Sequence, residues 1–399
     1  MMTGAAMKLP SPYGALLMPV YVPSLLMAVS QEALTILLPL YMLEIGASPA
    51  FAALVVGLRG LGVLLFDVPA GMLVARFGDK PVLLGGLSLI FTGLLLLGVT
   101  TEPLLLGFAA IALGSGHAAW MLGRQSYLAD VCETQELGRA IAAMAGLQRG
   151  GALIGPFAGG ALAGFAGFPV AFAAGVASAV LAGAIVLAFA RAVPPHEDPD
   201  ASLAGTLGVL RAQRGVLATA GGSALVLQLM RATRQLLIPL FGQAVGLDVT
   251  TIGLVYSLAT VVDIALFYPS GVLADRFGRK WSAVPSMALY ALGLALLPLA
   301  AGFWSLLAVA TLLGFANGIG TGVVMIIGAD LARASGRHGQ FLGLWRLIGD
   351  VGISGAPLLV GTVVKAAGLA AASLTVAGLG VAGSLVMAYV VAETLRPSR

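Results

Sequence analysis

The chain has 399 residues, of which 59% are hydrophobic and only 10% are charged, and its mean hydropathy is +1.01. A soluble protein carries about 25% charged residues, so a soluble fold of this size could not cover its surface with so few. The formal net charge is only +4. This composition excludes a water-soluble enzyme, a disordered chain and a nucleic-acid-binding protein, and it indicates an all-α, polytopic membrane protein.

Residues able to hold a disulfide or a metal are scarce. Cys132 is the only cysteine, and His117, His196 and His338 are the only histidines. These residues lie far apart and show no ligand spacing, so we expect no disulfide, no metal and no cofactor.

Twelve apolar runs follow one another along the chain, and each is long enough to cross a bilayer as a helix. They lie near 14–42, 49–74, 81–99, 103–129, 138–164, 168–190, 215–243, 249–274, 281–300, 303–329, 338–366 and 369–392. The first run has no small-residue cleavage site after it, which favours a membrane span over a signal peptide.

The one long interruption is 192–214, which contains the polar, proline-rich stretch Pro194–Asp200. It predicts a linker between an N-terminal half, 1–191, and a C-terminal half, 215–399, each with six spans. Fourteen of the 21 basic residues lie in the termini and the even-numbered loops, whereas only Lys365 lies in an odd-numbered loop. The positive-inside rule therefore predicts cytoplasmic termini and linker, in a bacterial-type inner membrane.

The two halves align with each other at an offset of 200 residues, without a gap. Leu38–Tyr41 matches Ile238–Phe241, and Arg76–Lys80 matches Arg276–Lys280. Such a register across loops is not expected by chance. Two similar halves with a binding site between them at the bilayer midplane are typical of a transporter.

The segment Gly271–Lys280 resembles the signature loop of the major facilitator superfamily at every key position, and the resemblance covers nearly the whole chain. It implies a fold of twelve helices in two pseudo-symmetric halves around a central cavity. The first-half copy departs from the pattern, because it has Ala75 in place of the acid and Asp79 where a basic residue is usual.

In that family the signature loop controls gating. The resemblance implies that Asp275 faces a helix N-terminus of the opposite half, where the helix dipole favours an acid. It also implies pairing of Arg76 with Asp130 and of Arg276 with Asp330. The candidate gating residues are Gly71, Arg76, Gly78, Asp130, Gly271, Asp275, Arg276, Gly278, Arg279 and Asp330.

The fifth span carries the GxxxGPxxGG pattern of drug:proton antiporters, at Gly151, Gly155, Pro156, Gly159 and Gly160. Glycines four residues apart let a neighbouring helix approach closely, and a proline removes one helical hydrogen bond. The alternative interpretation is plain packing in a glycine-rich protein. The fourth-span motif of that group is not recognisable here, since Ala110 stands where its Arg is expected.

Ten ionisable residues fall inside the predicted spans, on spans 1, 2, 4, 5, 7, 8 and 11 only. They are Glu32, Arg59, Asp67, Arg124, Arg149, Arg231, Arg234, Asp263, Arg346 and Asp350. Charges in hydrocarbon are costly and are functional candidates by default. Their absence from spans 3, 6, 9 and 12, which are the outer helices in the family, predicts a polar central cavity.

Three acids are candidates for proton coupling. Glu32 is the first, since burial raises the pKa of a carboxyl toward a usable range; the alternative is a structural ion pair with Arg59. Asp263 is the second, or it pairs with Arg231 or Arg234. Asp67 lies close to the signature loop, so a gating or structural role is favoured for it.

Six Arg against four acids leave the interior with a formal charge of +2, which favours an anionic, zwitterionic or polar substrate. The alternative is that Arg124 and Arg346 snorkel toward the cytoplasm, which leaves the cavity near neutrality. Arg346 and Asp350 are spaced to neutralise each other on one helix. The candidate cavity residues are Arg59, His117, Arg149, Gln228, Arg231, Arg234 and Asn317.

No GxxxxGK[ST] phosphate loop is present in the sequence, so a solute or ion gradient is the expected energy source. We expect a secondary transporter and not an enzyme: a proton-coupled exporter that resembles the drug:proton antiporters, monomeric in the bilayer, with small amphipathic or anionic molecules and protons as its ligands. The alternatives are a proton-coupled symporter that imports an organic anion, and a non-transporting membrane sensor on the same fold.

Overall fold

The computed structural model describes residues 13–191, 203–335 and 337–395, and the regular structure in these ranges is helical. The N-terminal half contains α1 (Tyr13–Leu16), η1 (Leu17–Tyr21), α2 (Val22–Glu44), α3 (Pro49–Phe77), α4 (Asp79–Val99), α5 (Pro103–Val131), α6 (Thr134–Ala166) and α7 (Phe168–Phe189). The rest contains α8 (Leu203–Ala212), α9 (Arg214–Val216), η2 (Leu217–Gly221), α10 (Gly222–Ala244), α11 (Val249–Phe277), α12 (Lys280–Leu296), η3 (Leu297–Leu299), α13 (Phe303–Ile319), α14 (Val323–Ser335) and α15 (His338–Tyr389).

Twelve membrane spans are confirmed. Among the described residues, ten helices are long and apolar enough to cross a bilayer. One of them, α15, contains two spans, because its backbone leaves helical geometry at Gly368, where φ is +87°. The remaining span is α6, whose apolar stretch is diluted by glycines.

The helix ends lie within a few residues of the expected ones, and the predicted linker is partly helical. Residues 192–202 of it lie outside the described ranges, whereas Leu203–Ala212 form α8. The division into halves at 191 and 215 stays a prediction, although the helices on either side of it gather into two bundles.

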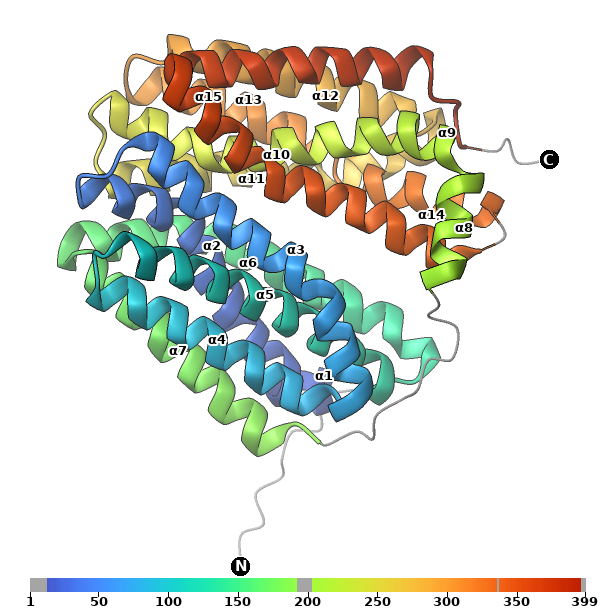
Figure 1. Cartoon of the computed structure of the whole chain (residues 1–399), viewed down its shortest axis with the longest axis horizontal. Helices are drawn as coiled ribbons and strands as arrows, with labels where there is room; N and C mark the ends of the chain where they lie inside the picture. The colour runs from blue at the N-terminus through green and yellow to red at the C-terminus, as the bar shows by residue number, and fades with distance from the viewer. Residues whose placement is uncertain (1–12, 192–202, 336, 396–399) are drawn as a thin grey trace, which may run out of the picture.

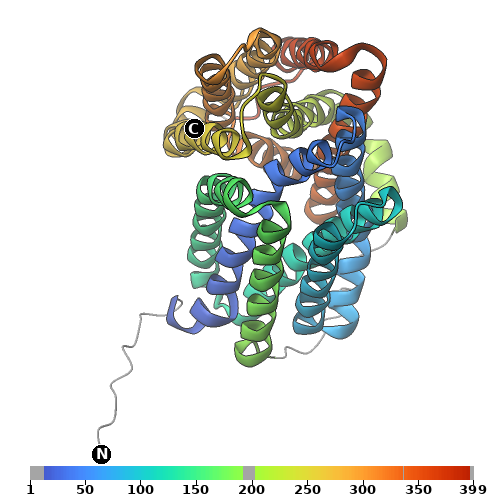
Figure 2. The same ribbon diagram turned by 90° about the vertical axis from the view of Figure 1, so that its left-hand side faces the viewer.

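Figure 1 shows these bundles side by side, blue to green for the first and yellow to red for the second, with α3 and α15 lying against each other between them. The other seam between the bundles is formed by α6 and α11. In the view of Figure 2 the first bundle again lies on one side of the molecule and the second on the other. The halves therefore meet along two seams, α3–α15 and α6–α11, which the 200-residue repeat relates to each other.

Contacts in the half of each helix that is remote from the chain termini close both seams. Ser354 Oγ donates to the carbonyl oxygen of Gly60 at 2.8 Å, which joins α15 to α3. Thr250 Oγ1 donates to the carbonyl oxygen of Gly160 at 3.2 Å, which joins α11 to α6. Gly253 lies so close to the carbonyl of Pro156 that a Cβ there would overlap it. The space between the halves is therefore sealed on the face opposite the termini.

The tenth span is broken between α13 and α14. The chain leaves the helix at Gly320 and turns at Gly322, where φ is +79°. Such a break leaves carbonyl oxygens without helical partners, which is tolerated at membrane depth only where other groups satisfy them. The break therefore faces the cavity described next.

Candidate substrate cavity and gating network

Nine of the ten charged residues inside the spans line two chambers between the halves. Each chamber receives five of them, and Glu32 belongs to both. The chambers also share Ala232, Gln235 and Ile353, so they adjoin. The predicted polar cavity therefore exists, with Arg124 as the one charged span residue outside it.

The first chamber, called the α3–α15 chamber, has a volume of about 390 Å³. Its polar lining consists of Gln31, Glu32, Thr35, Arg59, Asp67, His117, Gln235, Arg346, Asp350 and Ser354. Apolar side chains of α2, α3 and α10, such as Leu34, Val56 and Leu236, complete it. A ligand in this chamber meets both charges and an apolar wall.

Arg59 Nη2 donates to Gln31 Oε1 at 2.7 Å. The guanidinium of Arg59 also attracts the carboxylate of Glu32, but no pair of their charged atoms lies within 4.0 Å. The expected alternative of a close ion pair between them is therefore not present in this structure. The side chain of Glu32 lies at the junction of the two chambers.

Two acids from opposite halves face one arginine. Arg346 Nη2 lies 3.9 Å from Asp67 Oδ1, and Arg346 Nε lies 3.7 Å from Asp350 Oδ2. The expected pairing of Arg346 with Asp350 is confirmed, and Asp67 joins it from α3. This cluster links α3 to α15 on the termini side of the sealed contacts.

The second chamber, called the α6–α11 chamber, has a volume of about 370 Å³ and a more polar wall. Its lining consists of Glu32, Arg149, Ala152, Gln228, Arg231, Ala232, Arg234, Gln235, Tyr256, Thr260, Asp263, Tyr290, Asn317, Thr321 and Ile353. Arg149, Gln228, Arg231, Arg234 and Asn317 were all predicted cavity residues, and His117 and Arg59 lie in the other chamber.

Asp263 is held by two neighbours. Arg234 Nη1 lies 3.9 Å from Asp263 Oδ2, and the Asn317 amide donates to the same oxygen. The Tyr290 hydroxyl in turn donates to Asn317 Oδ1 at 2.8 Å. Asp263 therefore pairs with Arg234 and not with Arg231, which were the two partners expected for it.

Arg231 is fixed by neutral groups. Its Nη1 donates to Gln228 Oε1 at 2.8 Å, and its Nη2 donates to the carbonyl oxygen of Gly320 at 2.7 Å. The latter carbonyl lies at the break in the tenth span and also accepts the backbone N–H of Val323 at 3.3 Å. The positive charge of Arg231 is therefore not neutralised by an ion pair, since no acid of the described residues lies within 4.0 Å of it.

Arg149 lies on the opposite wall of this chamber, across the seam from α11. Its guanidinium carbon is 3.7 Å from the centre of the Phe267 ring, a cation–π contact. A ring face attracts a cation without neutralising it. Arg149 therefore also remains a net positive charge in the cavity.

The glycine motif of the fifth span packs α6 against two helices. A Cβ on Gly155 would lie 2.6 Å from the carbonyl oxygen of Val29 and 2.9 Å from Glu32 Cβ. Gly160 of the motif lies against Val249 of α11 in the same way. The motif thus sets how closely α6 approaches α2 beside Glu32 and α11 at the sealed seam.

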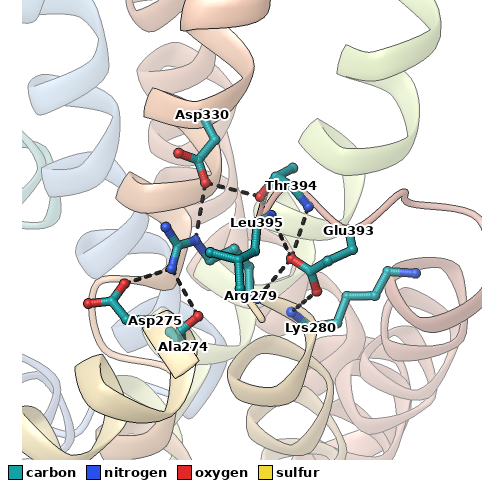
Figure 3. A network of polar contacts seen from close by, with 8 residues as sticks. All are labelled: Ala274, Asp275, Arg279, Lys280, Asp330, Glu393, Thr394 and Leu395. Carbon is teal, nitrogen blue, oxygen red and sulfur yellow. Dashed lines mark hydrogen bonds and ion pairs between the residues drawn. The ribbon is translucent and has the colours of Figure 1, made fainter. Parts of the chain in front are cut away.

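On the termini side, the second-half signature loop forms the network of Figure 3. Arg279 donates from Nη1 to Asp275 Oδ1 at 2.7 Å and from Nε to Asp330 Oδ2 at 3.1 Å. Partial burial acts to lower the pKa of Arg279, but the hydrogen bonds to Asp330 and Asp275 outweigh it and raise that pKa. The prediction that Arg276 pairs with Asp330 is wrong, because Arg279 reaches it across the turn.

The expected position of Asp275 is also wrong. Its side chain is 69% exposed and pairs with Arg279 of its own half, so it does not face a helix N-terminus across the seam. In the first half, Arg76 lies over the ring of Phe77, and Asp130 is exposed without an ion pair to Arg76. That pairing was predicted and is absent from this structure.

The C-terminal tail completes the network of Figure 3. Glu393 Oε1 accepts the backbone N–H groups of Arg279, Thr394 and Leu395, and its Oε2 accepts that of Lys280. Partial burial acts to raise the pKa of Glu393, but these four hydrogen bonds hold it below its ordinary value. Glu393 therefore places a carboxylate at the N-terminus of α12.

In the first half, a residue of the helix itself supplies the carboxylate at the helix N-terminus. Its counterpart of α12 is α4, which begins with the buried residue Asp79, and at that position the second half has Arg279. An acid near a helix N-terminus is stabilised by the dipole. Asp79 thus places a carboxylate at the start of α4, and Glu393, which lies far away in the sequence, places one at the start of α12.

The glycines of the signature loops divide into two kinds. Gly78 and Gly278 end α3 and α11 with φ of +79° and +114°, a backbone region that favours glycine. Gly71 and Gly271 lie within α3 and α11. The first pair is therefore required by the turn, and the second pair keeps a predicted gating role.

Arg124 does not snorkel, since only 2% of it is exposed and its guanidinium lies over the Trp120 ring. Arg346 is half exposed, with 50% of its side chain accessible. Sequence reasoning missed Tyr290, which reaches the cavity from the ninth span, one of the spans expected to be outer. A tyrosine hydroxyl in a span without charged residues between 281 and 300 was the available signal.

The model of the Major Facilitator Superfamily matches the chain twice, at 21–233 and 221–399. The chain belongs to the major facilitator superfamily. The two matches cover both bundles, in agreement with the repeat. It is therefore a membrane transporter family member and not an enzyme.

Sequence relatives carry the name multidrug resistance protein MdtH. The protein of Aeromonas hydrophila is 26% identical over 237 residues, and that of Aeromonas salmonicida is 27% identical over 261 residues. These alignments span 58% and 61% of both partners. A relative from Escherichia coli O1:K1 is 23% identical over 313 residues, which cover 76% of this chain and 75% of that protein.

Solved structures share the fold at low identity. A POT family transporter in complex with a thioalcohol-conjugated peptide aligns with a TM-score of 0.78 and 10% identity, over 94% of this chain and 96% of that one. The nucleoside transporter NupG aligns with a TM-score of 0.75 and 14% identity, over 94% and 98%. These likenesses describe the architecture alone.

Proposed function

We propose that this chain is a proton-coupled exporter of small amphipathic or anionic molecules, set in a bacterial-type inner membrane with both termini in the cytoplasm. The observation that carries the proposal is the place of Glu32. Its carboxyl lines both chambers, where it meets any ligand that spans them. The name of the MdtH relatives, multidrug resistance protein, supports export.

The coupling follows from competition at Glu32. Burial of Glu32 disfavours its ionised form, whereas the charges of Arg59 and Arg234 attract the carboxylate, and a proton removes that attraction. A substrate group that pairs with the ionised carboxylate and a proton that neutralises it then favour different charge states of the same site, which is what exchange transport requires. With cytoplasmic termini, the sealed face of the structure is the outer one, and the cavity is in its inward-facing state.

The motif at Gly151–Gly160 supports this class of transporter. It brings α6 against α2 beside Glu32 and against α11 at the seam that closes the outer face. The motif therefore joins the proposed proton site to the seam that must open and close in the cycle.

The proposal is tested by proton release from purified protein on addition of a dye. Ethidium serves as a cationic probe and carboxyfluorescein as an anionic one, and pH is followed in weakly buffered solution. We expect release with at least one probe, loss of release in Glu32→Gln, and unchanged release in Glu44→Gln, which alters an exposed acid at the end of the same helix. Release that persists in Glu32→Gln refutes the role of Glu32.

A symporter that imports an organic anion is the second candidate. Arg149 and Arg231 favour it, because they leave positive charge in the α6–α11 chamber without an acid within 4.0 Å among the described residues. In liposomes a symporter moves solute in the direction in which protons flow, whereas the exporter moves it the opposite way. The direction of flux under an imposed pH gradient separates the two.

A further inference from the structure

The two seams between the halves carry surplus charge of opposite sign. On α3–α15, Asp67 and Asp350 share the single Arg346, which leaves one negative charge in excess. On α6–α11, Arg149 faces the Phe267 ring, and no acid in the described part of the chain lies within 4.0 Å of it. One wall of the cavity is therefore acidic and the opposite wall is basic.

This polarity is not a property of the repeat. At the offset of 200 residues, Asp67 corresponds to Phe267, Asp350 to Gly150, and Arg149 to Gly349. Each charge occurs in one copy only, so the helical framework does not require it. The two copies have diverged toward opposite charges at matching places on the seams.

The other charges of the cavity balance locally. Asp263 is neutralised by Arg234 at 3.9 Å, and Glu32 is balanced by the attraction of Arg59. Arg231 is the exception, since it contacts only the neutral groups of Gln228 and Gly320. Its Nε also has no hydrogen-bond partner. The surplus positive charge of the α6–α11 chamber therefore lies at Arg149 and Arg231.

We propose that the cavity binds an amphipathic zwitterion whose two charges are well separated. Its anionic group lies at Arg149 and Arg231, its cationic group lies at Asp67 and Asp350, and its apolar body crosses the junction of the chambers. Leu34, Leu236 and Ile353 supply apolar surface along that path. A ligand with only one charge leaves the opposite wall unneutralised in a low-dielectric cavity, where an unpaired charge is costly.

This inference rests on the proposed export function and deepens it. The ammonium group of the zwitterion favours ionised carboxylates in the shared cavity, including Glu32 at the junction of the chambers, so binding of the zwitterion and protonation of Glu32 oppose each other. The anionic group contributes affinity at a place where no proton is exchanged. The positive charges of Arg149 and Arg231 are then compatible with exchange of the substrate against protons.

The test uses three matched fluorescent probes and purified full-length protein at neutral pH. Nα-dansyl-L-lysine carries a carboxylate and a distant ammonium group. Its methyl ester keeps only the ammonium, and its Nε-acetyl derivative keeps only the carboxylate. Affinity is measured by dansyl fluorescence, and we expect the zwitterion to bind at least about tenfold more tightly than either derivative, which corresponds to about 1.4 kcal/mol.

Variants assign each charge to its wall. Arg149→Gln should lower the affinity of the zwitterion to that of the ester and leave the ester unchanged. Asp350→Asn should lower it toward that of the acetyl derivative and leave that derivative unchanged. Arg139→Gln is the control, because 60% of the Arg139 side chain is exposed at the start of α6, and it should change no affinity.

The inference is overturned if the wild-type protein shows no preference for the zwitterion, including no binding of it, or if Arg149→Gln weakens ester and zwitterion alike. The wild-type comparison stands even where a variant does not fold. Preference for the zwitterion without proton-coupled flux in liposomes contradicts the export function and leaves the binding inference intact. Proton-coupled flux without a preference for the zwitterion contradicts the binding inference and leaves the export function intact.

Discussion

Replacing Asp330 by Asn should destabilise the protein by about 2 kcal/mol, whereas replacing Asp275 by Asn should cost less than about 1 kcal/mol. Both acids accept a hydrogen bond from Arg279. The side chains of Asp330 and Arg279 are only 14% and 12% exposed, and a hydrogen bond to a charged group in such a place contributes about 1.5–3 kcal/mol. Asp275 is 69% exposed, and exposed ion pairs contribute about 0.2–1 kcal/mol.

The difference between the two variants is the informative quantity, because Asn keeps the shape of Asp in both. Asp330 also accepts from Thr394 Oγ1 at 3.2 Å, so its loss should loosen the tail. Thermal unfolding of the detergent-solubilised proteins, with carboxypeptidase digestion of the tail alongside, measures both effects. An equal loss of stability in the two variants, or a larger one in Asp275→Asn, refutes the assignment of Arg279 and Asp330 as the principal pair.

Three further outcomes are expected. Glu393→Gln should lower the thermal midpoint at neutral pH and remove a loss of stability that the wild-type protein shows in acid. The pKa of Glu393 in the folded protein lies below its ordinary value of 4.5. The stabilisation by its carboxylate is therefore present above pH 4.5 and is lost as the pH falls through the folded pKa. Gly155→Ala should destabilise the protein, because the new Cβ meets Val29 and Glu32 where α6 packs on α2. Gly146→Ala on the same helix is the control: its Cβ meets nothing within 4 Å, so this change should be neutral or stabilising. Ser354→Ala removes the bond to Gly60, worth about 0.5–1.5 kcal/mol, and should shift spin-label distances between the halves toward opening of the sealed face.

One result would contradict each of these three predictions. For Glu393 it is an unchanged acid limb of the stability curve in the Gln variant. For the glycines it is equal stability of the two Ala variants, since only one site is crowded. For Ser354 it is a distance distribution identical to that of the wild-type protein.

Most of the fold could be predicted from the sequence because hydropathy is a local signal. The twelve spans, the break near Gly368 and the two-part organisation follow from run lengths and the repeat. The partly helical linker could not be predicted, because the polar stretch before Leu203 gives no sign of where α8 begins. The break at Gly320 was also missed, since glycines are common in every span.

The cavity could be predicted as a set of residues but not as pairs. Charged side chains avoid the hydrocarbon and face the interior of the protein, so nine of the ten charged residues line the cavity as predicted. Which arginine meets which acid depends on helix rotation and on turns. Arg276 and Arg279 are equally good partners for Asp330 by sequence, and only the turn at Gly278 selects Arg279.

The contribution of distant residues was beyond the sequence pattern. Glu393 reaches α12 from the end of the chain, more than a hundred residues away. Tyr290 enters the polar network from a span, 281–300, that has no charged residue. Both are long-range contacts, which the periodicity of a single helix does not encode.

Coupled flux in liposomes tests the central claim most directly. The purified protein is reconstituted with Nα-dansyl-L-lysine on one side and a pH gradient across the bilayer, and movement of the probe and of protons is recorded together. We expect the probe to move against the direction of proton flow in the wild-type protein, and Glu32→Gln to exchange probe across the bilayer without any response to the gradient. Probe movement in the same direction as protons, or gradient-driven transport that survives in Glu32→Gln, contradicts the account.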